Sequence, residues 1–228
     1  SRLVSYLPAM LQNFLAIVLV FKNCLHSESI VEFGSGDGSP VIQALLRSQF
    51  NGKIQGFEIN FSAYQVAQSK IHICKLTDKY FIHNRCLFDS VKPYATYLVS
   101  NPPYLPAPDN QLYQPFLHGG IEGITFTQNL LSLNYKNVLI LMSSYSNPQG
   151  LIEDAKSKNY CVSNFVVSPM QFGYYSSEPK VMNQIQELRN SDRAFYSENI
   201  YLLAGVLFTK RPTSRDLSGE LLKVMTSL

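Results

Sequence analysis

A strand, a glycine-rich turn and a helix follow one another close to residue 30, and few folds accommodate that succession. Residues 29–33 form a short apolar run, residues 34–38 read Gly-Ser-Gly-Asp-Gly, and residues 41–50 carry apolar side chains at helical spacing. Glycines permit positive φ and let a ligand approach the backbone closely. Because α/β folds bind nucleotide-like ligands at such turns, the pattern predicts an α/β protein with a binding site after this strand.

The alternation of strands and helices continues along the chain. Further strands are expected at 53–57, 80–84, 96–100, 137–142, 160–168 and 199–209, and further helices at 60–70, 123–133, 148–158 and 181–190. This order predicts an α/β fold with a doubly wound, mostly parallel seven-stranded sheet flanked by helices. In a chain of 228 residues it indicates a single domain over 1–228, with a helical lead-in over 1–28 and a helical tail over 211–228.

Acidic residues around the glycine turn indicate the kind of ligand. Glu58 ends the second strand 20 residues after Gly38, a spacing at which a carboxylate reaches ribose hydroxyls, although a solvated acid at a strand end is the alternative. The third glycine of a dinucleotide-binding turn would fall at Ser39, which argues against NAD. Glu32 and Asp37 lie where a pyrophosphate would dock, so the turn favours a cationic ligand.

The segment Ser100-Asn101-Pro102-Pro103-Tyr104 follows the fourth expected strand. Its prolines fix φ and remove two backbone donors, so hydrogen-bond acceptors dominate here. The Asn101 side-chain oxygen and the Pro102 carbonyl can each accept from an N–H of an amide or aromatic amine, and the Tyr104 ring can cover its face. Asn101, Pro102 and Tyr104 are therefore the expected catalytic residues, and with Pro103 they are the expected substrate contacts. A proline-rich turn, with Tyr104 packed at a rim, is the alternative.

Composition argues against several other kinds of site. The four cysteines show neither C-x-x-C spacing nor a nearby histidine pair, so we expect no metal and no disulfide framework, and a reducing cytoplasm fits best. A net charge of +3 is too small to argue for a nucleic-acid groove by itself. The apolar run at 7–21 is shorter than a membrane span, so no membrane partner is expected.

Residues 31–38, Glu58 and residues 100–104, placed in this order at strand ends, resemble the S-adenosylmethionine-dependent methyltransferases of the Rossmann-like type. The resemblance spans about Ile30 to Lys210, and it implies S-adenosylmethionine as cofactor and S-adenosylhomocysteine as product. The cofactor contacts that it implies are Glu32, Gly34, Ser35, Gly36, Gly38, Glu58, Ile59, Cys86, Leu87 and Asn101. Within these enzymes, Asn-Pro-Pro-Tyr marks those that methylate nucleobase amines or the side-chain amide of glutamine.

The segments 105–106 and 118–123 are similar to the HemK-type protein glutamine methyltransferases, with Glu122 where those enzymes often have Asp. The resemblance thus implies a protein acceptor that presents a glutamine. The chain departs from the pattern at 85–88, where a Gly-Asp pair would contact adenine, and at 95–97, which lack the Asp usual before the fourth strand. The alternatives are an adenine- or guanine-amine methyltransferase of RNA or DNA, and a binding protein that kept the pocket but lost catalysis. An activating partner is left open.

Overall fold

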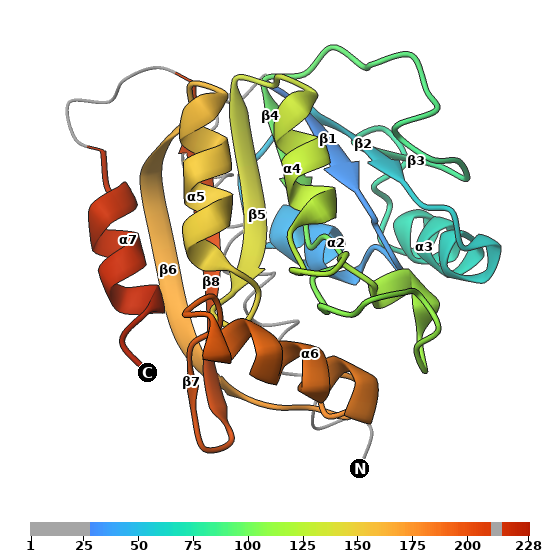
Figure 1. Ribbon diagram of the computed structural model, residues 1–228. Helices are drawn as coiled ribbons and strands as arrows, with labels where there is room; N and C mark the ends of the chain where they lie inside the picture. Colours follow the sequence, from blue (N-terminus) through green and yellow to red (C-terminus); the bar gives the residue numbers. More distant parts are fainter. Residues whose placement is uncertain (1–27, 211–215) are drawn as a thin grey trace.

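The computed structural model describes residues 28–210 and 216–228 (Figure 1). Its strands are β1 (Ser29–Phe33), β2 (Lys53–Phe57), β3 (Tyr80–His83), β4 (Tyr97–Ser100), β5 (Asn137–Ser143), β6 (Cys161–Gln171), β7 (Tyr196–Ser197) and β8 (Ile200–Thr209). Its helices are α2 (Ser39–Leu46), α3 (Phe61–Ile73), α4 (Thr125–Ser132), α5 (Pro148–Ser157), α6 (Pro179–Asn190) and α7 (Ser218–Met225), and a 3-10 turn, η1 (Pro115–Leu117), lies between β4 and α4.

The strands form one sheet in the order β3-β2-β1-β4-β5-β8-β6, and the short β7 pairs with β8 outside this path. The pairs among β1 to β5 are parallel, whereas β8 is antiparallel to both β5 and β6. From β1 the chain proceeds outward to β2 and β3, and then returns to the other side of β1 to form β4 and β5. β1 and β4 therefore flank a topological switch point, and α/β proteins bind ligands at the carboxyl edge of such a point.

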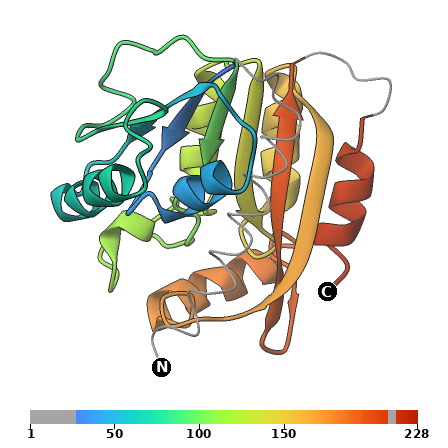
Figure 2. The ribbon, with the colours of Figure 1, turned by 180° about the vertical axis from the view of Figure 1, so that it is seen from behind.

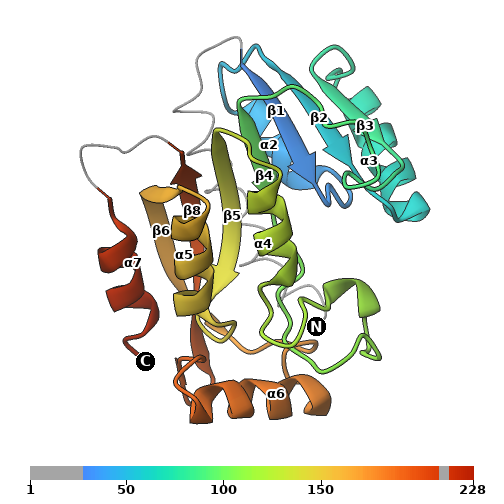
Figure 3. The same cartoon turned by 45° about the horizontal axis from the view of Figure 1, so that its top comes forward.

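Helices cover both faces of the sheet. In Figure 1, α4 and α5 lie in front of the strands and α7 stands beside β6, and Figure 2 shows α2 and α3 on the opposite face. Apolar strand side chains alternate between two buried clusters, one of which includes Val41 and Ile42 of α2 and the other Leu151 and Ile152 of α5. α6 lies across the edge at which β5 ends, as Figure 3 shows, and covers part of this edge.

Side chains that accept hydrogen bonds set the start of two helices. Asn60 precedes α3 and Asn147 precedes α5, and each side-chain oxygen accepts from the backbone N–H three residues further on, at 3.1 Å and 3.0 Å. These contacts satisfy N–H groups that have no partner within the helix. Both asparagines follow parallel strands closely, so they fix the turns that surround the switch-point edge.

The predicted fold class is confirmed: the sheet is doubly wound and mostly parallel, and helices flank it. The pattern did not predict β7, a two-residue partner of β8. The helix expected at 41–50 spans Ser39–Leu46, and the strand expected at 160–168 extends to Gln171. The expected lead-in lies outside the described residues apart from residue 28, and the described part of the expected tail contains α7.

Candidate active site

The glycine turn and the Asn-Pro-Pro-Tyr segment leave the sheet side by side. β1 and β4 are parallel neighbours, with Phe33 opposite Ser100 at their ends. The Ser100 hydroxyl donates to the Phe33 carbonyl at 3.0 Å, which ties the two strand ends together. Gly34 and Asn101 follow these residues directly, so the two segments singled out in the sequence meet at the switch point.

The glycine turn is shaped by its backbone and held by a carboxylate. Gly34 and Gly36 have φ of 70° and 55°, and a Cβ at either would meet no atom within 4 Å, so conformation rather than crowding requires glycine there. Glu58, directly after β2, accepts from the Gly36 N–H through Oε2 and from the Asn60 N–H through Oε1, both at 2.7 Å. Glu58 therefore supports the backbone that a ligand would approach.

A cavity of about 500 Å³ lies at this edge of the sheet. The predicted site residues that line it are Glu32, Gly34, Ser35, Gly36, Asn101, Pro102, Pro103 and Tyr104. The predicted residues that do not line it are Gly38, Glu58, Ile59, Cys86 and Leu87. The structure thus brings the glycine turn and the proline segment onto one cavity, and places the expected ribose and adenine contacts outside its lining.

Glu32 is a buried carboxyl on the wall of this cavity. Its side chain is 6% exposed and accepts a hydrogen bond from the Tyr80 hydroxyl of β3. Burial raises the pKa of Glu32 from 4.5 to about 7, against the opposing effect of the Tyr80 hydrogen bond. The buried Ser35 hydroxyl lies close by, and it makes no hydrogen bond to any of the described residues. A cationic group in the cavity would favour the ionised carboxylate, so Glu32 is suited to an ammonium.

The second acid of the turn is paired within the protein. The Asp37 carboxylate accepts from the Lys70 ammonium at 2.5 Å and from the Ser39 N–H at 3.0 Å. Burial alone would raise its pKa, but the Lys70 and Ser39 contacts hold the pKa of Asp37 below its usual value. Asp37 also lines the cavity, but Lys70 offsets its charge, so Glu32 is the better placed of the two acids to attract a cation.

The backbone of the proline segment is fixed by residues beyond η1 and β5. A Cβ at Gly119 would lie 2.7 Å from the Tyr104 Cα, so glycine is required for this close approach. The Ser146 hydroxyl donates to the Tyr104 carbonyl at 2.7 Å. Asn101 is exposed and lines the cavity, whereas Pro102 is buried. The segment thus has a fixed backbone and presents one polar side chain, that of Asn101, to the cavity.

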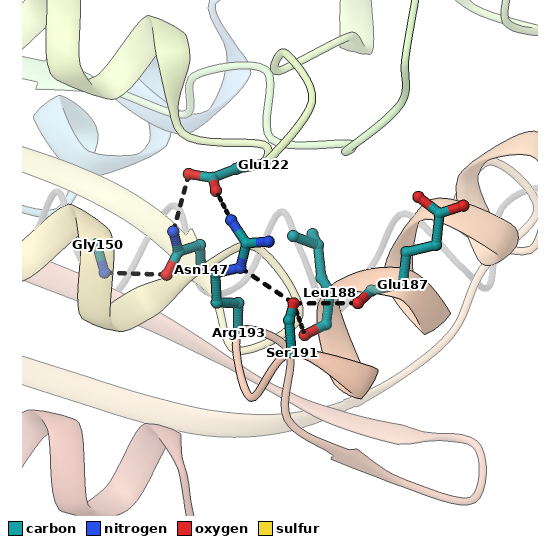
Figure 4. Close-up of polar contacts among 7 residues, drawn as sticks. All are labelled: Glu122, Asn147, Gly150, Glu187, Leu188, Ser191 and Arg193. Carbon is teal, nitrogen blue, oxygen red and sulfur yellow. Dashed lines mark hydrogen bonds and ion pairs between the residues drawn. The ribbon is translucent and has the colours of Figure 1, made fainter.

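Glu122 connects the loop between β4 and α4 to two other elements (Figure 4). Its carboxylate accepts a hydrogen bond from the Asn147 side chain at 2.9 Å and pairs with the Arg193 guanidinium. Asn147 precedes α5, while Arg193 follows α6 and donates to the Ser191 hydroxyl at 3.1 Å. One carboxylate therefore anchors the loop that carries the proline segment to the beginning of α5 and the end of α6.

The part of the cavity that is lined by residues after β5, on β8 and between β6 and α6 is rich in tyrosine, and the sequence analysis did not identify it. Tyr145 follows β5, Tyr201 lies on β8, Tyr174 lies between β6 and α6, and all three line the cavity. The insertion of β8 between β5 and β6 brings these elements to one edge. Because that strand order is not written in any local pattern, no signal in the sequence places these tyrosines together.

The comparisons with known proteins concern the fold. No family model matches the chain, and no curated protein matches it in sequence. A candidate RNA methyltransferase from Pyrococcus horikoshii is similar in structure, with a TM-score of 0.59 and 10% identity over 88% of this chain and 84% of that one. An S-adenosylmethionine-dependent methyltransferase from Geobacter sulfurreducens, in complex with S-adenosyl-L-homocysteine, has a TM-score of 0.55 and 10% identity over 87% of this chain and 90% of that one. The METTL16 methyltransferase domain has a TM-score of 0.54 and 11% identity over 90% of this chain and 84% of that one. The chain has the Rossmann-like methyltransferase fold.

The methionine end of S-adenosylmethionine, the ligand that this methyltransferase fold implies, fits the residues present. Glu32 offers a carboxylate to an ammonium, and Gly34 and Gly36 line the cavity with backbone that carries no side chain. Each carboxylate oxygen of Glu58 accepts one hydrogen bond from the protein backbone and keeps a further lone pair. That lone pair could accept a hydrogen bond from a ribose hydroxyl.

The expected cofactor contacts Ile59, Cys86 and Leu87 lie on two neighbouring loops, after β2 and after β3. Ile59, after β2, is 54% exposed, Cys86 is half-buried, and Leu87 is buried in the core. The Asn84 side chain, which the sequence analysis missed, donates to the carbonyls of Glu58 at 2.9 Å and Ile59 at 3.3 Å. Asn84 therefore ties the loop after β3 to the loop after β2.

The described residues form neither a metal site nor a membrane-spanning helix. Within residues 28–210 and 216–228, no group of three or more His, Cys, Asp or Glu side chains could hold a metal ion. Over the same ranges, no helix has the length and apolar character needed to cross a bilayer. His118, beside the glycine pair, has its Nε2 3.0 Å from the Ala107 carbonyl, which ties it into the loop.

Proposed function

We propose that the protein is an S-adenosylmethionine-dependent N-methyltransferase that acts on a planar amine or amide. The observation that carries the proposal is the meeting of the glycine turn and the segment 101–104 on one cavity, with Phe33 and Ser100 in register beneath them. Transfer of a methyl group to nitrogen needs a cofactor pocket and a grip on an N–H donor within reach of each other. We assign these two tasks to the glycine turn and to the segment 101–104, which follow adjacent strand ends.

The residues of the chain act on the nitrogen that receives the methyl group. S-adenosylmethionine, when bound, supplies an electrophilic methyl group on its sulfonium. The acceptor nitrogen is a poor nucleophile because its lone pair is delocalised, and positive charge builds on it as the new N–C bond forms. The S–C bond breaks with its electron pair left on sulfur, which gives S-adenosylhomocysteine, and the methylated nitrogen then releases one N–H proton to water. The Asn101 side-chain oxygen and the Pro102 carbonyl accept its N–H groups and stabilise that charge. The Tyr104 ring covers the planar group, and Glu32 receives the ammonium of the cofactor.

The side-chain amide of a protein glutamine is the first acceptor to consider, because the resemblance to the HemK-type enzymes implies it. The second is an adenine or guanine amine of RNA or DNA. The tyrosines that line the cavity favour this second acceptor, and a solved structure that shares the fold is that of a candidate RNA methyltransferase. The cytoplasm is the proposed compartment, on the cysteine pattern.

The experiment that tests this function is transfer of a labelled methyl group from S-adenosylmethionine to total RNA and to total protein from the source cell. We expect label in one of the two fractions, and far less with Asn101→Ala. Label in neither fraction, with S-adenosylhomocysteine still bound by the protein, would overturn the proposal in favour of a binding protein that has lost catalysis.

A further inference from the structure

Tyr80 lies on β3, at the edge of the sheet, and yet its hydroxyl donates to the Glu32 carboxylate on β1. Because β2 separates these two strands, the tyrosine side chain passes over β2 to make the contact. We infer that Tyr80 is a positioning residue that holds Glu32 for the ammonium of the cofactor, and that this ammonium displaces a proton from Glu32 when it binds. The inference rests on the proposed function and deepens it by coupling cofactor binding to the release of a proton.

Two glycines make room for the tyrosine side chain. Gly56 of β2 is the register partner of Glu32. A Cβ at Gly56 would lie 3.0 Å from the Tyr80 Cε2 and 2.4 Å from the Ser35 Oγ, so a side chain there would force one of them to move. A Cβ at Gly38 would lie 3.4 Å from Cε1, at the other edge of the Tyr80 ring. Tyr80 itself is 2% exposed, so packing fixes the direction of its hydroxyl toward Glu32.

The titratable groups that face Glu32 are two acids and a tyrosine. They are Tyr80 of β3, Glu58 after β2 and Asp37 of the glycine turn, and Asp37 is paired with Lys70 of α3. The neighbour of Glu32 on β4 is Val99, and α2 contains no charged residue. Burial and the charges of the two acids raise the pKa of Glu32 to about 7, against the hydrogen bond from Tyr80. Near pH 7 the protein without ligand therefore holds Glu32 in both protonation states.

A bound ammonium shifts this balance to the carboxylate. Its positive charge favours the ionised form, and the proton that Glu32 loses passes to water. Tyr80 donates to Oε2, so we assign Oε1 to the ammonium. Tyr80 keeps its own proton, because burial and the charge of Glu32 raise the pKa of Tyr80 well above its usual value. Tyr80 is therefore a donor to Glu32 both before and after the ammonium binds.

Ser35 provides a second neutral donor beside the same carboxylate. It is 4% exposed and lines the cavity, and its hydroxyl has no hydrogen bond to any described residue. The hydroxyl lies close enough to Glu32 to lower the pKa of that carboxyl. A buried hydroxyl without a partner costs a fold stability, and an ionised Glu32 offers it an acceptor. The site is thus built to hold the charged form of Glu32 once a cation is present.

The test is calorimetric titration of the wild-type protein with S-adenosylhomocysteine, whose amine is already protonated near neutral pH. Titrations in two buffers that differ in ionisation enthalpy count the protons released on binding. At about pH 7 we expect roughly half a proton per ligand, and the affinity should rise by about tenfold from about pH 6 to about pH 8. 5′-Methylthioadenosine, which has the same adenosine and thioether but no ammonium, should bind without releasing a proton.

Tyr80→Phe keeps the ring and removes the donor, so the pKa of Glu32 should rise further. At about pH 7 we expect the affinity for S-adenosylhomocysteine to fall several-fold and the release to approach one proton per ligand, with the affinity for 5′-methylthioadenosine unchanged. Glu32→Gln should release no proton. Tyr135→Phe is the matched control and should behave as the wild type, because Tyr135 is equally buried, donates to the Pro93 carbonyl at 3.0 Å and does not line the cavity.

Two results would overturn the inference and leave the proposed function standing. One is binding of S-adenosylhomocysteine by the wild-type protein with no release of protons and the same affinity at each pH. The other is a proton release and a pH profile in Tyr80→Phe that match those of the wild type. If the wild-type protein did not bind S-adenosylhomocysteine at all, the proposed function would fail first and this inference with it.

Discussion

A buried carboxyl costs a folded protein stability whenever it is ionised. Glu32 loses its proton near pH 4.5 when unfolded and near pH 7 when folded, so the folded state binds more protons between these values. Stability is therefore lost as pH rises from about 4.5 through about 7. At about 1.4 kcal/mol per pH unit, the loss from this one group is roughly 3 kcal/mol.

Glu32→Gln removes this titration and keeps the shape of the side chain. We expect the wild-type protein to lose roughly 3 kcal/mol of unfolding free energy relative to the variant between about pH 4.5 and about pH 8, because only the wild type must then bury a charge. Urea unfolding at a series of pH values measures the difference. If the unfolding free energies of the two proteins changed in parallel with pH, the pKa of Glu32 would not be raised in the folded state.

Asn101 separates chemistry from cofactor binding. Asn101→Ala should lower the rate of methyl transfer by roughly 10²–10³, because an oxygen that stabilises the charged nitrogen is lost. The affinity for S-adenosylhomocysteine should change little, since the glycine turn stays intact. Asn183→Ala is the control, because Asn183 is an exposed residue of α6 that does not line the cavity. If Asn101→Ala transferred the methyl group at the wild-type rate, the segment 101–104 would be only a turn with no part in catalysis.

At the scale of elements, the loop between β4 and α4 acts as a brace for the strand end that carries Asn101. The Gly119 N–H donates to the Leu105 carbonyl at 2.8 Å, and the Leu105 N–H donates to the Leu117 carbonyl at 3.1 Å. The loop therefore folds back on the proline segment. Glu122 then fastens it to α5 and α6 through side chains that are partly exposed, so the close backbone approach at Gly119 carries more of the loop's stability than the ion pair does.

Gly119→Ala tests this brace. A Cβ there meets backbone atoms that cannot move freely, so we expect a loss of about 1–3 kcal/mol in unfolding free energy and a lower rate of methyl transfer. Gly219→Ala is the control, because Gly219 lies in α7 with no atom within 4 Å of an added Cβ, and alanine favours helix. Chemical denaturation compares the two variants. Equal stability of both would show that the loop tolerates the side chain.

Local patterns in the sequence reach only part of this arrangement. The succession of β1, turn and α2 could be predicted because glycine, β-prone and helical residues each act on their own backbone. The pairing of Asp37 with Lys70, 33 residues apart, and the contact of Tyr80 with Glu32, 48 residues apart, depend on how α3 and β3 pack, which no local spacing encodes. The role of Glu58 in holding Gly36 was hidden for the same reason.

At the scale of the whole molecule, the two halves of the cavity come from the two parts of the sheet. The parallel strands β1 and β4 provide Glu32, the glycine turn and the proline segment. The antiparallel insertion of β8 between β5 and β6 provides the tyrosines. The sequence analysis predicted the strands but not their order, so it identified only the residues from β1 and β4. The residues proposed to hold the cofactor's ammonium and the acceptor nitrogen, Glu32 and Asn101, therefore both belong to the part that was predictable.

The most direct test of the central claim is calorimetric titration of the wild-type protein with S-adenosylmethionine, S-adenosylhomocysteine and NAD. We predict saturable binding of both sulfur nucleosides, with a matching rise in thermal stability by linkage, and no binding of NAD. Binding of NAD, with no heat from either sulfur nucleoside, would contradict the account.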